Sequence, residues 1–145
     1  MFRLPPIKLW RNLSLIIFFI AIIFTLIGTV AIHGDLVVHW SSAGVPNNSS
    51  GKWFLWVMLL LAFLSMFTHS SYLKYRSGQN PLSIEMAGAF SSGLVATWTI
   101  GIIILVTYNI HPKVFSPIIG TIAIISCYIL FVIIAYIRDK KNFKY

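Results

Sequence analysis

The chain has 145 residues, of which 58% are hydrophobic and only 10% are charged. Soluble domains carry about 25% charged residues, so this composition excludes an ordinary soluble protein and indicates a membrane protein. The formal net charge of +8 does not indicate nucleic-acid binding, because most Lys and Arg residues lie in short segments beside apolar runs.

The first half of the chain predicts two membrane-spanning helices. Residues 13–32 contain no charged side chain and match the ~20 residues that cross a hydrocarbon core. Pro5-Pro6 is expected to block a helix before this run. The run is longer than the apolar region of a typical cleavable signal peptide, so we expect it to be a span. A second apolar run covers residues 53–72, and residues 33–52 form a polar loop between the two spans.

The second half predicts two more spans, at residues 86–110 and 117–137. Asn80-Pro81 and Ser116-Pro117 each resemble a helix start, because the polar side chain accepts a free backbone N–H and Pro suits the first helical position. Glu85 then falls in the first turn of the third helix, where we interpret it as complementing the helix dipole. The sequence therefore predicts an all-α, four-transmembrane-helix bundle that forms a single domain over residues 1–145.

The positions of Lys and Arg predict how this bundle crosses the membrane. Nine of the 11 lie in the N-terminal segment, the middle connection and the C-terminal tail, and only Lys52 and Lys113 lie in the other two connections. Short loops rich in Lys and Arg stay on the cytoplasmic side. We therefore expect both termini to be cytoplasmic and the 33–52 loop to lie outside.

Small side chains in the third span predict how the helices pack. Hydrophobicity does not drive helices together within lipid, so close approach of small residues must do so. Two neighbouring rows in this span contain Gly88, Ser92 and Ala96, and Gly93, Thr97 and Gly101. We expect this helix to be the centre of the bundle and the first span, with Ala21, Thr25 and Thr29, to be its partner. Such rows also mediate homo-oligomers, and that alternative remains open.

No catalytic or metal-binding constellation stands out. No Lys, Arg, Asp or Glu lies well inside a span, which disfavours a pump or a secondary transporter. His33, Asp35 and His39 are weak candidates for a metal site, but their spacing fits no known pattern. A triad of Ser41, His39 and Asp35 lacks any sign of an oxyanion hole. We therefore expect no enzyme activity, no cofactor and no metal.

The 33–52 loop contains the one distinctive motif. His39, Trp40, Gly44, Pro46 and Lys52 stand at the spacing of a conserved loop in a membrane domain of unknown function, found at the N terminus of SdpI-type immunity proteins. The chain resembles this family over about residues 13–73 and has Ser41 and Asn47 where the family has Asn and Asp. The resemblance implies a multi-pass protein of the plasma membrane of a bacterium or an archaeon, related to proteins that give protection against a secreted killing peptide.

Two interpretations of the motif residues follow from their chemistry. Gly44 and Pro46 favour a tight turn, Lys52 fits an anchor that reaches the lipid headgroups, and His39 and Trp40 can fold back over the bundle. These five residues then form either a structural cap or a binding surface. Asn47 and Asn48 also begin overlapping glycosylation sequons.

The sequence thus predicts a small non-enzymatic membrane protein that contacts the lipid bilayer and binds a peptide or envelope component through its outer loop. The alternative is an accessory structural subunit of a larger membrane complex. Neither hypothesis involves nucleic acid.

Overall fold

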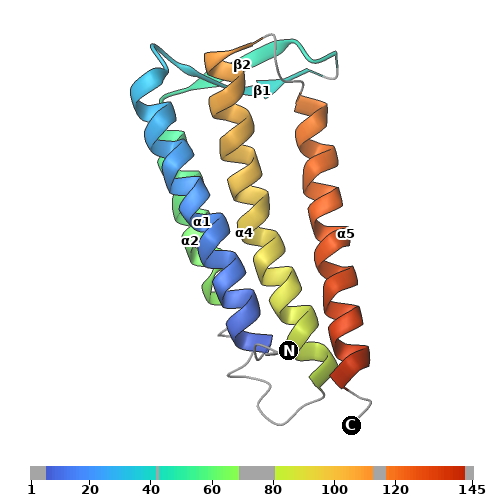
Figure 1. Ribbon diagram of the computed structural model, residues 1–145. Coiled ribbons are helices and arrows are strands. Elements are labelled where there is room, and N and C mark those ends of the chain that lie inside the picture. Colours follow the sequence, from blue (N-terminus) through green and yellow to red (C-terminus); the bar gives the residue numbers. More distant parts are fainter. Residues whose placement is uncertain (1–5, 42, 69–80, 113–116, 143–145) are drawn as a thin grey trace.

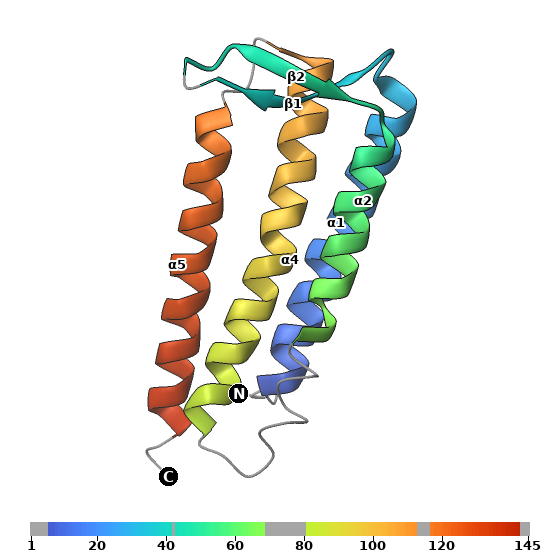
Figure 2. The same ribbon diagram turned by 180° about the vertical axis from the view of Figure 1, so that it is seen from behind.

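The computed structural model describes residues 6–41, 43–68, 81–112 and 117–142. These residues form four helices, α1 (Pro6–Ala31), α2 (Trp53–Ser65), α4 (Pro81–Ile110) and α5 (Pro117–Asn142). A hairpin of β1 (Leu36–Trp40) and β2 (Pro46–Ser50) lies across one end of the bundle (Figures 1 and 2). We call this the hairpin end; the start of α1 and the end of α5 lie together at the opposite end.

Helix α1 begins earlier than the sequence predicted. Pro5-Pro6 was expected to block a helix, yet α1 starts at Pro6 and runs for 26 residues. A proline at the first helical position loses no hydrogen bond, because that N–H has no partner within the helix, and its fixed φ suits the helix. The expectation was therefore wrong: Pro6 begins the helix that it was expected to prevent.

Helix α2 is shorter than the span predicted over residues 53–72. It has 13 residues and ends at Ser65, where the N–H of Met66 turns back to the carbonyl of Phe63. The Ser65 hydroxyl donates to the carbonyl of Leu61, and the Thr68 hydroxyl donates to that of Ser65. Such side-chain bonds compete with the continuing helical ladder. Residues 69–72 of the predicted span lie outside the described residues.

Helices α4 and α5 begin at Pro81 and Pro117, as the cap-and-proline pattern predicted. Helix α5 continues five residues beyond the predicted end at Ile137. The extension carries Arg138, whose Nε donates to Glu85 of α4 over 2.8 Å. A tertiary ion pair therefore stabilises a helix end that composition alone assigns to a polar tail.

A short hairpin in the polar loop between the first two helices adds a two-stranded sheet to the helical bundle. Strands β1 and β2 pair antiparallel, with irregular register around His39. The chain turns at Gly44, whose φ of 75° is strained for other residues, and the Ser41 N–H closes the turn on the carbonyl of Val45. Polar residues such as those of β2 have low strand propensity, so no strand was evident from the residue pattern.

Helix α4 lies at the centre of the bundle and packs against α1, α2, α5 and β1, which confirms the prediction made from its small residues. Its closest partner is α1, also as predicted. A buried apolar cluster near the hairpin joins α1, α2 and α4 through residues such as Ala21, Leu55 and Val106. A second cluster near the opposite end joins α1, α4 and α5 through Trp10, Ala89 and Phe131.

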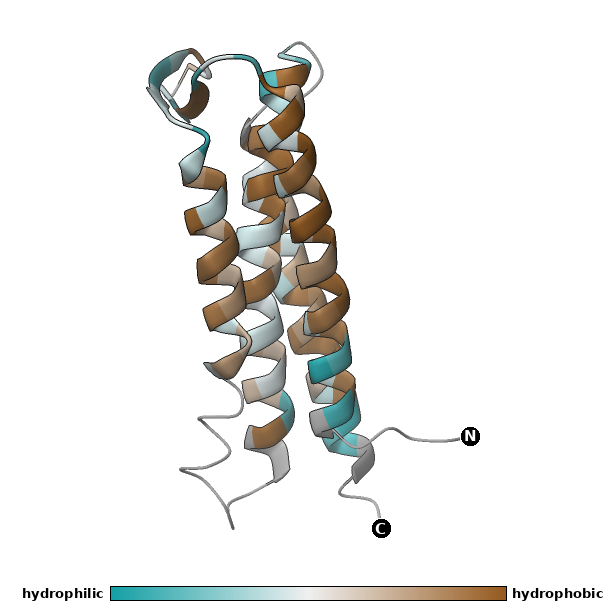
Figure 3. Cartoon of the chain, turned by 90° about the vertical axis from the view of Figure 1, so that its left-hand side faces the viewer, coloured by the Kyte–Doolittle hydropathy of each residue, from teal (hydrophilic) through white to brown (hydrophobic). Residues whose placement is uncertain are grey.

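Among the described residues, three helical segments are apolar and long enough to cross a membrane, namely Lys8–Ala31, Ile84–Ile110 and Ile118–Lys140. Figure 3 shows largely hydrophobic helix shafts, with hydrophilic residues gathered at the hairpin and at the opposite end. These features indicate a membrane protein. With 13 residues at 1.5 Å each, α2 is about 20 Å long, which is less than a hydrocarbon core of ~30 Å.

Candidate functional site: the hairpin end and the opposite ion pair

The hairpin is fixed to the bundle by the side chain of Asn109, near the end of α4. Its Oδ1 accepts the N–H of Val37 over 2.8 Å, and its Nδ2 donates to the carbonyl of Val37 over 3.1 Å. The same Nδ2 donates to the carbonyl of Leu105 in α4. Asn109 thus bonds to β1 as a neighbouring strand would, and it ties the strand to a helix.

Trp40, at the end of β1, faces the bundle. Its ring and the Tyr108 ring form an edge-to-face pair, with a centroid distance of 4.9 Å and an interplanar angle of 84°. Trp40 also packs against the apolar cluster of the hairpin end. Edge-to-face pairs of this kind stabilise by ~0.5–1.5 kcal/mol beyond the buried area. The indole N–H of Trp40 is buried and has no hydrogen-bond partner among the described residues.

The remaining motif residues are distributed over the rest of the hairpin end. The His39 ring is exposed and hydrogen bonds to the side chain of Asn47 on β2. Gly44 lies in the turn, and Pro46 is the first residue of β2 rather than part of the turn. Asn47 and Asn48, the sequon residues, are exposed.

The side chain of Lys52, predicted to reach the lipid headgroups, contacts the end of α1. It immediately precedes α2, and its Nζ donates to the carbonyl of Thr29 in the last turn of α1 over 3.1 Å. A cation near the carbonyl end of a helix satisfies a free acceptor and complements the helix dipole. Lys52 therefore joins α1 to α2 beneath the hairpin.

A cavity of about 290 Å³ lies directly below β1. Strand β1 closes the cavity at the hairpin end, and we call it the roof. Helix α4, which we call the floor, forms the back of the cavity, and α2 and α5, which flank α4 in Figure 2, form its two sides. The wall residues are Val38, Trp40, Phe54, Met58, Gly101, Ile104, Leu105, Gly120, Thr121 and Ile124. None of these ten residues is charged. The cavity therefore suits an apolar occupant.

The weak metal candidates do not come together. Among the described residues no three His, Cys, Asp or Glu side chains are grouped closely enough to hold a metal ion, and this covers His33, Asp35 and His39. Ser41, the nucleophile of the weak triad hypothesis, accepts the N–H of Val45 within the turn. The structure thus gives these polar residues local roles in the hairpin.

The small residues of α4 contact three different helices. Gly88 faces the Trp10 ring of α1, Gly93 faces the Tyr128 ring of α5, and Gly101 faces the Met58 methyl group of α2. The Ser92 hydroxyl shares a hydrogen bond of 2.9 Å with Ser14 of α1. Ala96 is buried, and the Thr97 hydroxyl donates to the carbonyl of Gly93 within α4.

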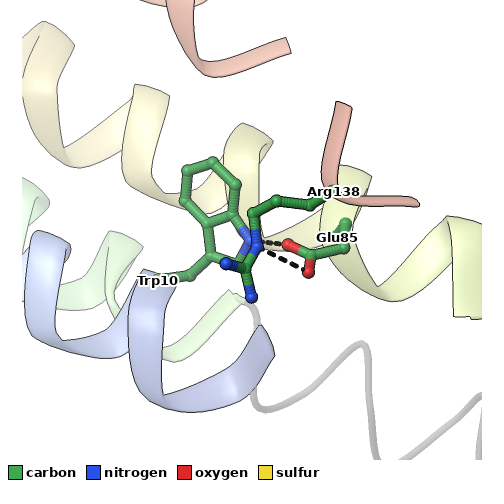
Figure 4. Close-up of polar contacts among 3 residues, drawn as sticks. All are labelled: Trp10, Glu85 and Arg138. Atoms are coloured by element: carbon green, nitrogen blue, oxygen red, sulfur yellow. Dashed lines mark hydrogen bonds and ion pairs between the residues drawn. The ribbon is translucent and has the colours of Figure 1, made fainter. Parts of the chain in front are cut away.

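The opposite end contains a buried polar cluster that the sequence did not reveal. Glu85 is 0% exposed and accepts two hydrogen bonds, from Trp10 Nε1 over 2.6 Å and from Arg138 Nε over 2.8 Å (Figure 4). These contacts join α1, α4 and α5. The interpretation of Glu85 as a first-turn dipole partner is corrected: no acidic residue lies in the first turn of α4, and Glu85 holds three helices together. We call this the ion-pair end.

Asp139 lies beside this cluster on the buried face of α5, below Phe131 and Ala135. It is 1% exposed, and neither carboxylate oxygen has a hydrogen-bond partner among the described residues. Two of the three acidic residues of the chain are thus buried at the ion-pair end.

Sequence reasoning missed Asn109, Trp10 and Arg138. Trp10 and Arg138 belong to segments with many interfacial aromatic and basic residues, where the sequence offers no sign of a specific partner. Asn109 offered a clearer signal, because a polar amide close to the end of an apolar helix needs a partner there.

Searches of protein-family models, curated proteins and solved structures find no match to this chain. The family resemblance of the His39–Lys52 motif therefore stays a prediction.

Proposed function

We propose that this chain is a small, non-enzymatic, multi-pass membrane protein that binds a peptide or another envelope component at its hairpin end. The observation that carries this proposal is the cavity of about 290 Å³ beneath β1. Ligand sites in proteins are mostly apolar hollows with a few polar groups, of ~300–1,000 Å³. The cavity lies at the lower limit of this range.

The firm attachment of the hairpin supports the same proposal. Asn109, Lys52 and Trp40 hold the roof of the cavity and the helices beside it through contacts with α4 and α1. An ordered site loses less conformational entropy on binding than a mobile loop does. Protection against a secreted peptide is the form of this function that the motif resemblance favours.

The proposed topology places the hairpin outside the cell and both termini in the cytoplasm. The uneven distribution of Lys and Arg supports this orientation. The four helices then cross in alternating directions, with α2 and the residues that follow it as the second crossing. Cysteines introduced as Asn48→Cys and Asn142→Cys, in a Cys127→Ser background, test the topology in intact cells. An impermeant maleimide should label only position 48; labelling of position 142 alone would reverse the assignment.

Ligand binding is tested with the purified protein and a cell-envelope extract separated into a peptide fraction and a lipid fraction. A ligand that binds only the folded state raises the melting temperature. We expect one fraction to raise it in the wild type and in Ile122→Phe, which alters an exposed residue outside the cavity wall. The same fraction should have no effect on Thr121→Phe, whose new ring narrows the cavity. If neither fraction shifts the wild type, the proposed function is wrong.

The second candidate is an accessory subunit of a larger membrane complex. Helix α5 favours it, because among the described elements α5 packs mainly against α4 and leaves residues such as Ile129 and Ile133 exposed. Lipid covers such a face equally well. A partner protein that co-purifies in fixed stoichiometry, and is lost on Ile129→Ser and Ile133→Ser, would favour this candidate.

A further inference from the structure

We propose that the cavity below β1 holds a single hydrocarbon chain of a membrane lipid, which enters from the surrounding leaflet between α2 and α5. This inference rests on the proposed function and names the class of its ligand. The walls, the open side and the hairpin edges each bear on the choice of ligand.

The walls disfavour charged ligands as stable occupants and offer few polar groups to water. Thr121 and Trp40 are the only residues of the wall whose side chains carry a polar group. A buried water makes about 2–4 hydrogen bonds, and these two side chains provide only the lower end of that number. With no charged wall residue, nothing compensates the cost of burying an ionic group. The occupant of lowest free energy is therefore a hydrocarbon.

The cavity lies where lipid hydrocarbon chains can reach it. The side of the cavity away from its floor, α4, opens between α2 and α5, which do not pack closely against each other. Exposed apolar residues flank this opening, among them Val57 on α2 and Ile125 on α5. In a membrane these faces border lipid chains, so a chain reaches the cavity without crossing water.

The hairpin edges disfavour an extended peptide as the occupant. A peptide strand would need free backbone groups at an edge of the sheet. Asn109 occupies both backbone groups of Val37 on β1. On β2, Pro46 has no N–H, and the Ser49 N–H is bonded to the side chain of Asn48. Both edges are thus protected in the way that natural proteins protect exposed strands.

The indole N–H of Trp40 positions the head of the lipid chain by offering a hydrogen bond to it. This donor is buried at the roof and lacks a partner among the described residues, which costs free energy in a folded protein. The ester carbonyl at the head of a lipid chain is an acceptor. A small rotation of the indole on binding would pair the two groups, with the chain extending down α4 from Leu105 towards Gly101.

The inference is tested in vesicles of phosphatidylethanolamine and phosphatidylglycerol that contain a little phosphatidylglycerol with a diazirine on one chain. After illumination, mass spectrometry measures labelling of the wall residues Gly101, Ile104, Leu105, Gly120 and Ile124 relative to the exposed Ile129 and Ile133. We expect this ratio to fall about tenfold in Thr121→Phe, equivalent to ~1.4 kcal/mol of binding free energy, and to be unchanged in Ile122→Phe. Trp40→Phe keeps the ring against Tyr108 and should lower the ratio about threefold, the loss expected for one hydrogen bond.

Several outcomes would overturn the inference. A ratio that Thr121→Phe does not change means that only surrounding lipid is labelled. If Thr121→Phe does not fold, Ile124→Trp narrows the cavity from the same helix and takes its place. Absent labelling, together with a melting shift from the peptide fraction that Thr121→Phe abolishes, would reject the lipid and leave the proposed function intact. Absent labelling with no shift from either fraction would reject both.

Discussion

The two ends of the bundle are held together by different physics. At the hairpin end, hydrogen bonds from the uncharged side chain of Asn109 and an aromatic contact hold β1 over the cavity. At the ion-pair end, a fully buried carboxylate is bonded to an indole and a guanidinium from two other helices, and a glycine lets the indole pack closely. The comparison suggests that the ion-pair end provides stability, whereas the hairpin end retains space and so is suited to binding.

The largest expected effect lies at the ion-pair end. Arg138→Met leaves Glu85 buried without its cationic partner, and breaking such a pair costs ~3–5 kcal/mol. The free energy of unfolding, measured in detergent, should fall by this amount. The matched change Lys140→Met at an exposed site should have little effect on it. The double variant Glu85→Gln, Arg138→Met should recover part of the stability. A double variant as unstable as the sum of its two single changes would show that the pair is not coupled.

Substitutions at two glycines of α4 test how tightly each end of the bundle is packed. A methyl group at Gly88 meets the Trp10 ring, whose position is fixed by Glu85, whereas a methyl group at Gly101 meets the flexible end of Met58 at 2.6 Å beside the cavity. Gly88→Ala should therefore destabilise by ~1–3 kcal/mol, the usual cost of overpacking. Gly101→Ala should be close to neutral, because Met58 can move into the hollow. Equal melting temperatures for the two variants would contradict the proposed difference between the ends.

A local effect is expected from Asn109→Leu. This change leaves the N–H and the carbonyl of Val37 without their hydrogen-bond partner, which costs ~1–3 kcal/mol of free energy. The loss weakens the attachment of the hairpin to α4. Amide hydrogen exchange should accelerate in β1 and stay unchanged in the ion-pair half of α4. Asn48→Ala, an exposed change on β2, serves as the control. Faster exchange throughout α4 would show that the two ends unfold as one unit.

The smallest expected effect is that of Lys52→Met. This change removes the cation from the carbonyl of Thr29 and should cost ~0.3–1 kcal/mol, typical of a charge at a helix end. High salt should reduce the difference between the variant and the wild type. A loss as large as that of Arg138→Met would mean that the hairpin end also depends on a strong ionic contact.

The sequence by itself determined the features that depend on neighbouring residues. Long apolar runs predicted the helices, the prolines at positions 81 and 117 marked two helix starts, and the small residues of the third helix identified the centre of the bundle. These signals are local because helix length, capping and small-residue spacing are properties of one segment. The same local reasoning failed at Pro6, where a helix-starting residue was interpreted as a block.

Only the tertiary structure decided which distant residues meet. Trp10 and Glu85 are separated by 75 positions, and Val37 and Asn109 by 72. No periodicity or local motif specifies such pairs, because each depends on how the other helices and the hairpin are positioned around α4. The cavity has the same origin: its ten wall residues come from four elements, and their spacing depends on how closely α2 and α5 approach α4. Local chemistry thus fixed the helices, and their packing created the space between them.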